Sequence, residues 1–171
     1  GKSWKPVGAG LEPAIYLLLV DPVHSATVYA ASRSGKLWKS VDRGATFAAL
    51  TVAIGATDDI YNLRFEPGKS EILWLASEKG LFRSADGGMS WQRSDRDSGR
   101  YLIQPVALDP ADARTLLAAS AGGGVYRSED GGTSWAPSSS GLTAAWVHRI
   151  HAVPGPPTIF VQTAPGLFRP A

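Results

Sequence analysis

The sequence predicts an all-β protein, a small or partial β-propeller built from about four four-stranded antiparallel blades. Two observations predict this class. An eight-residue pattern, complete in Ser128–Trp135, recurs at a fixed interval, so that Asp42, Asp86 and Asp130 lie 44 residues apart. Between its copies, short runs of strand-forming residues alternate with turns rich in glycine and proline. A fixed period of roughly 40 to 50 residues with four strands per unit is typical of propeller blades.

The repeated octet is predicted to be a hairpin turn. It recurs as Ser84–Trp91, more loosely as Ser40–Phe47, and in truncated form as Gly1–Trp4. Aspartate can accept backbone N–H bonds two residues on, and glycine adopts a positive φ at low cost. A single catalytic or metal site rarely needs one identical acid per repeat, so we interpret these residues as structural. The predicted turn residues are Ser40, Asp42, Gly44, Phe47, Ser84, Asp86, Gly88, Trp91, Ser128, Asp130, Gly132 and Trp135.

Each unit is predicted to begin with a strand that ends in a proline turn. The prolines are spaced by 45, 43 and 44 residues. The apolar runs before them are too short for helices and are bounded by turns, which indicates strands. These first strands are Ile15–Val20, Ile60–Phe65, Ile103–Leu108 and Val147–Ala152.

Three more strands are predicted in each unit. A polar turn leads to the second strands, Thr27–Ala31, Ile72–Ala76, Thr115–Ala119 and Thr158–Gln162. A glycine turn opens the third, which reads aliphatic-aromatic-basic, and the octet turn leads to the fourth. Alternation along the third strand should direct its aromatic residue between neighbouring blades. These predicted core aromatics are Trp38, Phe82, Tyr126 and Phe168.

The whole chain, residues 1–171, is interpreted as one propeller domain with units at about 4–46, 47–90, 91–134 and 135–171. The first predicted strand of the chain, Trp4–Val7, is of the fourth-strand type, and the last, Leu167–Arg169, is of the third-strand type. The segment Trp4–Val7 is therefore expected to complete the C-terminal blade. An unpaired sheet edge is a liability. Three arrangements would remove it: a self-closed four-bladed ring, a homodimer closing an eight-bladed ring with two-fold symmetry, or a longer polypeptide containing this segment.

Composition excludes several function classes. The net charge of +2 gives no electrostatic case for nucleic acid or for an anionic membrane. The chain has no cysteine, so neither disulfides nor thiolate chemistry is available. The apolar run at Tyr16–Val20 is far too short to span a bilayer. No cofactor, metal site or membrane insertion is therefore expected.

The octet resembles the Asp-box, or BNR repeat, S-x-D-x-G-x-[TS]-W. The complete unit is similar to repeats of xyloglucan-degrading propeller glycosidases, sortilin-type receptors and photosystem II assembly propellers, and through the octet alone to bacterial sialidases. This resemblance covers the chain end to end and implies a secreted or periplasmic protein. These families share a scaffold and differ in function. The arginine cluster of a sialidase and a pair of suitably spaced carboxylates are not recognisable, so no catalytic residue is predicted.

The candidate binding residues lie on the first strands, which line the central channel of a propeller. Polar side chains gather in the second and fourth units. His148 and His151 are three positions apart and would face opposite sides of a regular strand, so they should not share a metal ion. The loop Arg93–Arg100 is expected to be solvated. The predicted ligand-binding residues are Tyr61, Asn62, Arg64, Trp146, His148, Arg149 and His151.

These features predict a non-catalytic scaffold that binds a protein or carbohydrate partner through its loop face. The alternative is part of a glycoside hydrolase of the xyloglucanase or sialidase type. An enzyme should show convergent carboxylates or a carboxylate–histidine pair with perturbed pKa values, whereas a scaffold should show none.

Overall fold

The structure is a computed structural model of the 171-residue chain. It describes residues 3–52, 59–66, 68–95, 107–108, 112, 114–120, 122–143, 146–153 and 158–169. The described residues form fifteen β-strands and no helix. In this part of the chain no helix is therefore long and apolar enough to cross a membrane.

The strands form four antiparallel sheets, each built from strands that are consecutive in the chain. Adjacent strands are hydrogen-bonded in sequence order. The first sheet contains β1 (Ile15–Val20), β2 (Val28–Ser32), β3 (Leu37–Ser40) and β4 (Ala48–Leu50). The second contains β5 (Ile60–Phe65), β6 (Leu73–Ser77), β7 (Gly80–Ser84) and β8 (Gln92–Arg93). The third contains β9 (Ala107–Leu108), β10 (Leu116–Ser120), β11 (Gly124–Ser128) and β12 (Ala136–Pro137). The fourth contains β13 (Val147–Val153), β14 (Thr158–Thr163) and β15 (Gly166–Phe168).

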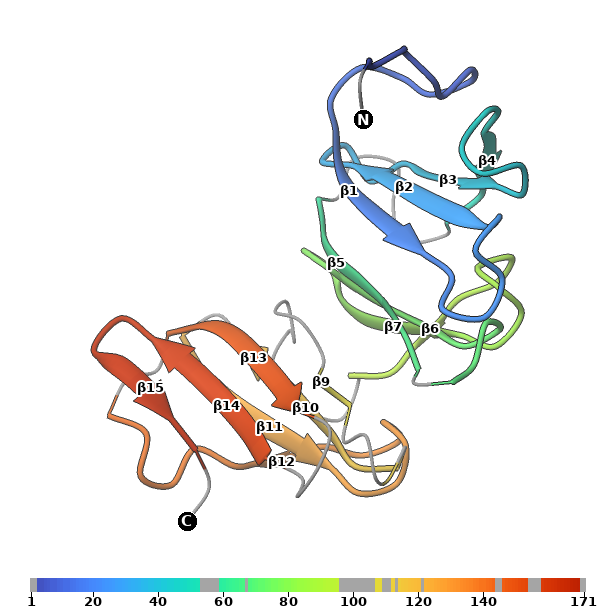
Figure 1. Ribbon diagram of the computed structural model, residues 1–171. Helices are drawn as coiled ribbons and strands as arrows, with labels where there is room; N and C mark the ends of the chain where they lie inside the picture. The colour runs from blue at the N-terminus through green and yellow to red at the C-terminus, as the bar shows by residue number, and fades with distance from the viewer. Residues whose placement is uncertain are drawn as a thin grey trace.

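The four sheets follow one another as the blades of an open arc, with the first strand of each blade on the inner side (Figure 1). The all-β propeller class predicted from the sequence is confirmed. The strand after each octet pairs with the strand before that octet, so both belong to the same blade. Each blade therefore ends one strand later than the corresponding predicted sequence unit; these units were 4–46, 47–90, 91–134 and 135–171. Of the predicted first strand Ile103–Leu108, residues 103–106 lie outside the described residues.

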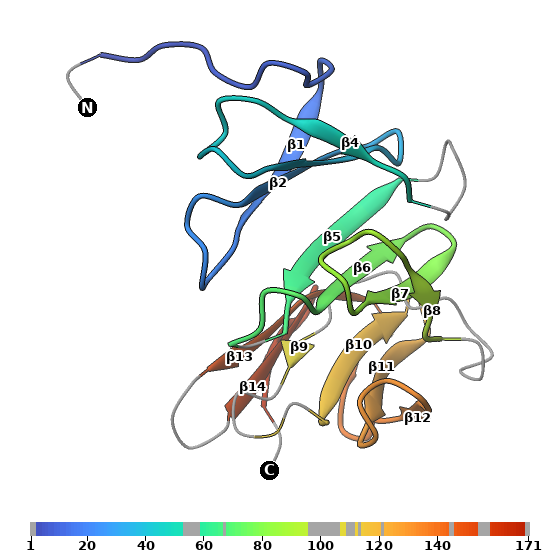
Figure 2. The ribbon, with the colours of Figure 1, turned by 90° about the vertical axis from the view of Figure 1, so that its right-hand side faces the viewer.

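The N-terminal segment does not form the strand predicted at Trp4–Val7, and it does not join the fourth blade. Residues 3–8 have no regular structure, and Trp4 is 94% exposed. Farther on, Ala9 forms a parallel bridge to Thr46, its N–H donates to Ala45 O, and its carbonyl accepts from Phe47 N–H. This arm lies against the octet turn of the first blade, at the opposite end of the arc from the C-terminus (Figures 1 and 2). The self-closed four-bladed ring is therefore not observed.

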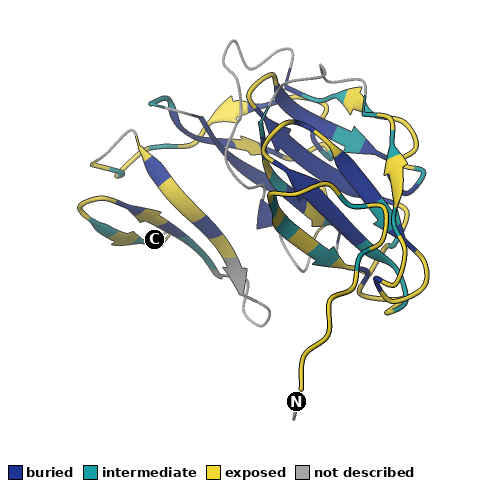
Figure 3. Ribbon diagram, turned by 90° about the horizontal axis from the view of Figure 1, so that it is seen from above, coloured by how far each residue is buried: buried dark blue, intermediate teal, exposed yellow. Residues whose placement is uncertain are grey.

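The core lies between the blades, because the second strands of the first three blades, β2, β6 and β10, are buried on both faces. In the fourth blade, Gln162 of β14 is exposed. β6 and β10 are buried along their whole length, so their sequences read as continuous apolar runs. One cluster joins the first and second blades, a second joins the second and third, and a third joins the third and fourth. The buried strands stand out in the view from above (Figure 3). Of the predicted third-strand aromatics, Trp38, Phe82 and Tyr126 are buried and Phe168 is half-buried.

The three octets form the same hydrogen-bonded turn. In the second blade, Ser84 Oγ donates to Asp86 Oδ1 over 2.7 Å and accepts the N–H of Gly88 over 2.8 Å. Asp86 in turn accepts the backbone N–H and the hydroxyl of Ser90 over 2.9 and 2.5 Å. The carboxylate thus reaches four residues ahead rather than the expected two, because the serine hydroxyl takes the nearer N–H groups. The corresponding bonds recur around Asp42 and Asp130.

Each later octet turn also contacts the blade before it. Tyr29 of the first blade donates its hydroxyl to Gly87 O over 2.8 Å. In the third blade, a Cβ added to Gly132 would lie 2.3 Å from Trp74 Cη2 of the second blade. Tyr29 and Trp74 occupy the same position of the second strand. Only glycine allows the turn backbone to approach this ring so closely. The turns therefore connect neighbouring blades as well as closing their own hairpins.

Two adjacent glycines separate the effect of this contact from backbone strain. Gly131 and Gly132 have φ values of 74° and 85°, but no atom lies within 4 Å of a Cβ placed on Gly131. Gly131→Ala should lower the free energy of unfolding by about 1–2 kcal/mol through left-handed strain alone. Gly132→Ala should cost about 1–3 kcal/mol more, since its methyl group collides with Trp74. Urea unfolding followed by circular dichroism measures both variants, and equal losses would contradict the contact.

The octet aspartates predict a defined acid sensitivity. The hydroxyl of Ser90, its backbone N–H and the hydroxyl of Ser84 lower the pKa of Asp86 from 3.8 to about 2. The unfolded chain therefore binds the proton first as the pH falls, so this stabilisation is complete above pH 3.8 and is lost toward pH 2. Asp86→Asn should lower the free energy of unfolding at neutral pH. The difference in this free energy between the variant and the wild type should become smaller as the pH falls from 3.8 toward 2. Urea titrations at several pH values measure it. The exposed Glu71→Gln is the control, and a constant difference for Asp86→Asn would refute the linkage.

Candidate functional site

Three of the inner strands, β1, β5 and β13, share a local irregularity that changes where their polar side chains point. The pairing register shifts between Ile15 and Leu17 in β1, between Ile60 and Asn62 in β5, and between Val147 and Arg149 in β13. A β-bulge places two successive residues opposite one partner residue and redirects their side chains. The skipped positions are Tyr16, Tyr61 and His148, each the second residue of its strand.

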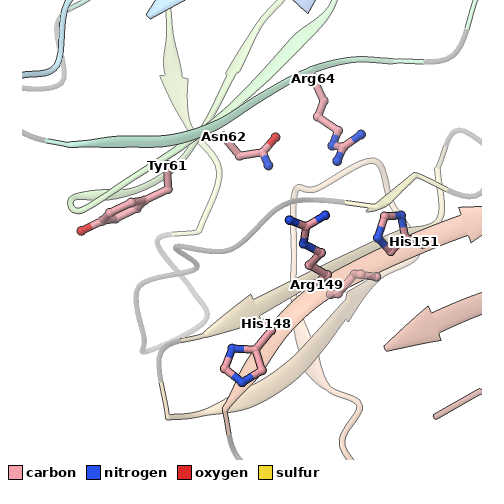
Figure 4. A pocket seen from close by; sticks show the side chains of 7 residues that line it. Tyr61, Asn62, Arg64, His148, Arg149 and His151 are labelled. Atoms are coloured by element: carbon pink, nitrogen blue, oxygen red, sulfur yellow. The ribbon is translucent and has the colours of Figure 1, made fainter. Parts of the chain in front are cut away.

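A polar pocket of about 320 Å³ lies between β5 of the second blade and β13 of the fourth. Asn62 and Arg64 project from β5 toward Arg149 and His151 on β13 (Figure 4). The pocket thus brings together side chains more than 80 positions apart in the sequence. It is lined by Tyr61, Asn62, Arg64, His148, Arg149, Ile150 and His151. Six of the seven residues predicted from the sequence meet here.

The pocket is rich in cationic and hydrogen-bond-donating groups. Arg64 and Arg149 are exposed, and within the described part of the chain neither guanidinium has an ion pair or a hydrogen bond. The seven lining residues include no carboxylate. A guanidinium presents a planar set of N–H donors that matches the two oxygens of a carboxylate, or those of a sulfate or phosphate. The arrangement is therefore suited to binding an anionic group.

Tyr61 and Asn62 add neutral polar groups at the edge of this pocket. Burial raises the pKa of Tyr61 above its ordinary value of 10.0, and the negative charges of Glu78 and Asp59 act in the same direction. The phenol therefore remains a neutral hydrogen-bond donor at physiological pH. Of the described lining residues, Ile150 alone is apolar, and it is buried against the third blade.

Two expectations about these residues need correction. Trp146 is not among the pocket-lining residues: it is 61% exposed, and its indole lies 3.9 Å from a Cβ placed on Gly122. His148 and His151 were expected on opposite sides of a regular strand, but both line the pocket because the bulge at His148 adds one residue. Among the described residues, no group of three or more histidine, cysteine, aspartate or glutamate side chains is placed to hold a metal ion.

Two of the buried acids, Asp21 and Asp95, have structural roles that sequence reasoning missed. Asp21 accepts bonds from Val23 N–H over 2.8 Å, from His24 N–H over 2.9 Å and from the Ser70 hydroxyl of the next blade over 2.6 Å. Burial opposes ionisation, but these hydrogen bonds outweigh it and lower the pKa of Asp21. The Asp-Pro turn was recognised in the sequence, but the partner from the next blade gave no signal.

Asp95 is the second missed acid. It lies in the loop that was expected to be solvated, yet it is 1% exposed and forms an ion pair with Arg93 Nε over 2.7 Å. Its carboxylate lies so close to Gly80 that a Cβ there would be 2.4 Å from Asp95 Oδ2. Asp95 thus anchors the start of this loop under the glycine turn. Residues 96–100 of the predicted loop lie outside the described residues.

Curated proteins similar to this chain are xyloglucanases. A xyloglucanase from Paenibacillus sp. is 34% identical over 80 residues, which are 43% of this chain and 8% of that protein. A probable oligoxyloglucan-reducing end-specific xyloglucanase from Neosartorya fischeri is 35% identical over 78 residues, covering 43% of this chain and 9% of that protein. The chain therefore spans less than a tenth of the length of these relatives. No family model matches the chain.

Solved propellers superpose on most of the chain. An ancestral GH74 enzyme gives a TM-score of 0.76 at 20% identity, covering 97% of this chain and 24% of that chain. The extracellular domain of a one-component system from B. thetaiotaomicron gives 0.70 at 18% identity, covering 94% and 22%. YCF48, solved bound to a D1 peptide, gives 0.65 at 16% identity, covering 93% and 52%.

These likenesses agree with the open arc and the blade pairing. At such low identity they show the fold alone, which is that of a β-propeller resembling the xyloglucanase and YCF48 propellers. The similarity of the repeats to those of glycosidases, expected from the sequence, is supported by the curated xyloglucanases.

Proposed function

We propose that this chain is a non-catalytic propeller scaffold that binds an anionic group of a protein or glycan partner in the pocket between β5 and β13. The observation that carries the proposal is the composition of that pocket. Two guanidinium groups without acidic partners in the described structure line it together with two imidazoles, a phenol and an amide. An anion entering there would gain charge-assisted hydrogen bonds without displacing an existing ion pair.

The same composition argues against hydrolysis of a glycosidic bond at this pocket. Glycosidases of the usual type need two carboxylates, one as acid and one as base or nucleophile. Among the residues that the structure describes, those lining the pocket supply none. The carboxylates whose pKa values are most strongly lowered, those of Asp42, Asp86 and Asp130, are bound within their own turns. Their hydrogen-bonding capacity is used for structure.

A binding role also fits one of the structural neighbours. YCF48 was solved in complex with a D1 peptide, so a propeller of this fold can hold a polypeptide segment. The second candidate function is part of a xyloglucan-degrading glycosidase, and the curated xyloglucanase relatives favour it. In that case the carboxylates would come from residues beyond the pocket described above.

The binding proposal predicts a charge-specific ligand preference. A hexa-aspartate peptide and a sulfated oligosaccharide should bind, and a neutral xyloglucan oligosaccharide should not. Arg149→Gln should weaken binding of the anionic probe about tenfold, as loss of one charged hydrogen-bonding partner does. Arg114→Gln removes the same charge from an exposed position in the third blade and should have little effect. Isothermal titration calorimetry measures all three proteins, and equal effects of the two substitutions would overturn the site assignment.

The glycosidase candidate is tested separately on polymeric xyloglucan. Under the binding proposal, the 171-residue chain releases no reducing ends above a buffer blank. Release that persists in Arg149→Gln would favour hydrolysis at another site. If the wild-type chain releases reducing ends, Arg149→Gln abolishes this release and the wild type binds no anion, the pocket would be catalytic and the scaffold proposal would be wrong.

A further inference from the structure

Two tyrosine rings are presented by equivalent positions of neighbouring inner strands. Tyr16 of β1 and Tyr61 of β5 are the residues skipped by the bulges of these strands, and their side chains are 41% and 40% exposed. The two strands lie against each other, so both rings belong to the junction of the first and second blades. A tyrosine left uncovered in this way offers a ligand both an apolar ring and a polar hydroxyl.

The tyrosine pair continues the cationic pocket toward the first blade. Tyr61 lines one end of that pocket, and its hydroxyl points away from Arg64 and Arg149 (Figure 4). At the other ring, Arg33 from the turn after β2 lies with its Cζ 5.4 Å from the centroid of Tyr16. This is the distance of a cation–π contact, which holds the guanidinium over the ring. Cationic groups are therefore found on both sides of the tyrosine pair.

Two carboxylates lie near the same rings. Burial is the main cause that raises the pKa of Tyr16 and of Tyr61, and the negative charge of Asp59 adds to it in both cases. Glu78 acts on Tyr61 in the same way, and its backbone N–H donates to Asp59 O over 3.1 Å. Among the described residues, neither carboxylate group has an ion pair or a hydrogen bond. Their oxygens are therefore available as hydrogen-bond acceptors.

This combination of groups favours a ligand that carries both negative charges and hydroxyl groups. An ionised carboxylate accepts hydrogen bonds and donates none, so Asp59 and Glu78 attract hydroxyls and repel anions. A pyranose ring suits the tyrosines, because it presents C–H groups that pack on an aromatic face and hydroxyls around its edge. A nucleic acid has a charge on every nucleotide, and an acidic peptide has one on every side chain. Both would place negative charge beside Asp59 and Glu78.

We propose that the partner is an acidic glycan in which charged sugars alternate with neutral ones, which rests on the anion-binding function proposed for the pocket. The carboxylate or sulfate of one sugar binds the guanidinium groups of Arg64 and Arg149. The neighbouring neutral sugar packs on Tyr61 and Tyr16, and its hydroxyls donate to the carboxylates beside these rings. Arg33, at the far side of Tyr16, is placed to meet the next charged sugar.

Isothermal titration calorimetry with the 171-residue chain compares the classes of ligand. A hyaluronan hexasaccharide alternates glucuronate with a neutral sugar, and a sulfated keratan hexasaccharide alternates a sulfated sugar with a neutral one. The better of the two should bind about tenfold more tightly than hexa-aspartate or a thymidine hexanucleotide, since only a glycan can use the rings and the carboxylates. Its identity shows whether a carboxylate or a sulfate is recognised. Equal or tighter binding of the peptide or the oligonucleotide would overturn the glycan proposal.

Substitutions at Tyr16 test the stacking contact separately from the anion pocket. Tyr16→Ala should weaken binding of the better hexasaccharide about tenfold, whereas hexa-aspartate should bind as before because Tyr16 does not line the pocket. Tyr16→Phe keeps the ring and should retain most of the affinity. Trp4→Ala removes an exposed ring from the N-terminal arm and should change neither titration.

The two titrations separate failure of this proposal from failure of the proposed function. If hexa-aspartate binds and Tyr16→Ala leaves the hexasaccharide affinity unchanged, the glycan site is wrong and the anion pocket stands. If neither hexa-aspartate nor a hexasaccharide binds the wild type, the anion-binding function is wrong, and the glycan proposal falls with it.

Discussion

The close approach of a glycine turn to an aromatic ring of the preceding blade holds the blades of this protein together. The turn backbone can reach Tyr29 or Trp74 because the facing positions, Gly88 and Gly132, carry no side chain. Serine and aspartate then fix the turn by satisfying its N–H groups, which keeps the glycines in place against the ring. These contacts lie beside the apolar clusters that join the first blade to the second and the second to the third, so turn and core fix the same two junctions.

The blades and their turns could be predicted from the sequence because their determinants are local. The octet and the alternation of its neighbouring strands lie within a few residues of one another, so a period of 44 residues specified both. The pocket could be predicted in part for a related reason. Inner-strand positions line the arc, and the repeat units differ in polarity there, at Asn62, Arg64, Arg149 and His151.

The remaining features depend on contacts between blades or on small changes of register. The bulge at His148 brings both histidines into the pocket, and one inserted residue has no marker in an otherwise regular strand. Burial of Asp95 under Gly80 and the bond from Ser70 to Asp21 join segments whose pairing the repeat does not encode. The position of the N-terminal arm, residues 3–8, could not be predicted for the same reason, because its sequence indicates a type of strand and not the sheet that the strand joins.

The repeated turns and the unequal inner strands suggest how such a molecule can acquire a new activity. A unit that carries its own turn and needs only its neighbours can be duplicated without redesign of the remainder. After duplication, the positions that hold blades together must stay alike, whereas those on the inner strand are free to diverge. A pocket shared by blades that are not adjacent, such as the one between Arg64 and Arg149, then arises when two copies diverge independently. In this architecture, binding specificity is set by the positions at which the duplicated units differ in sequence.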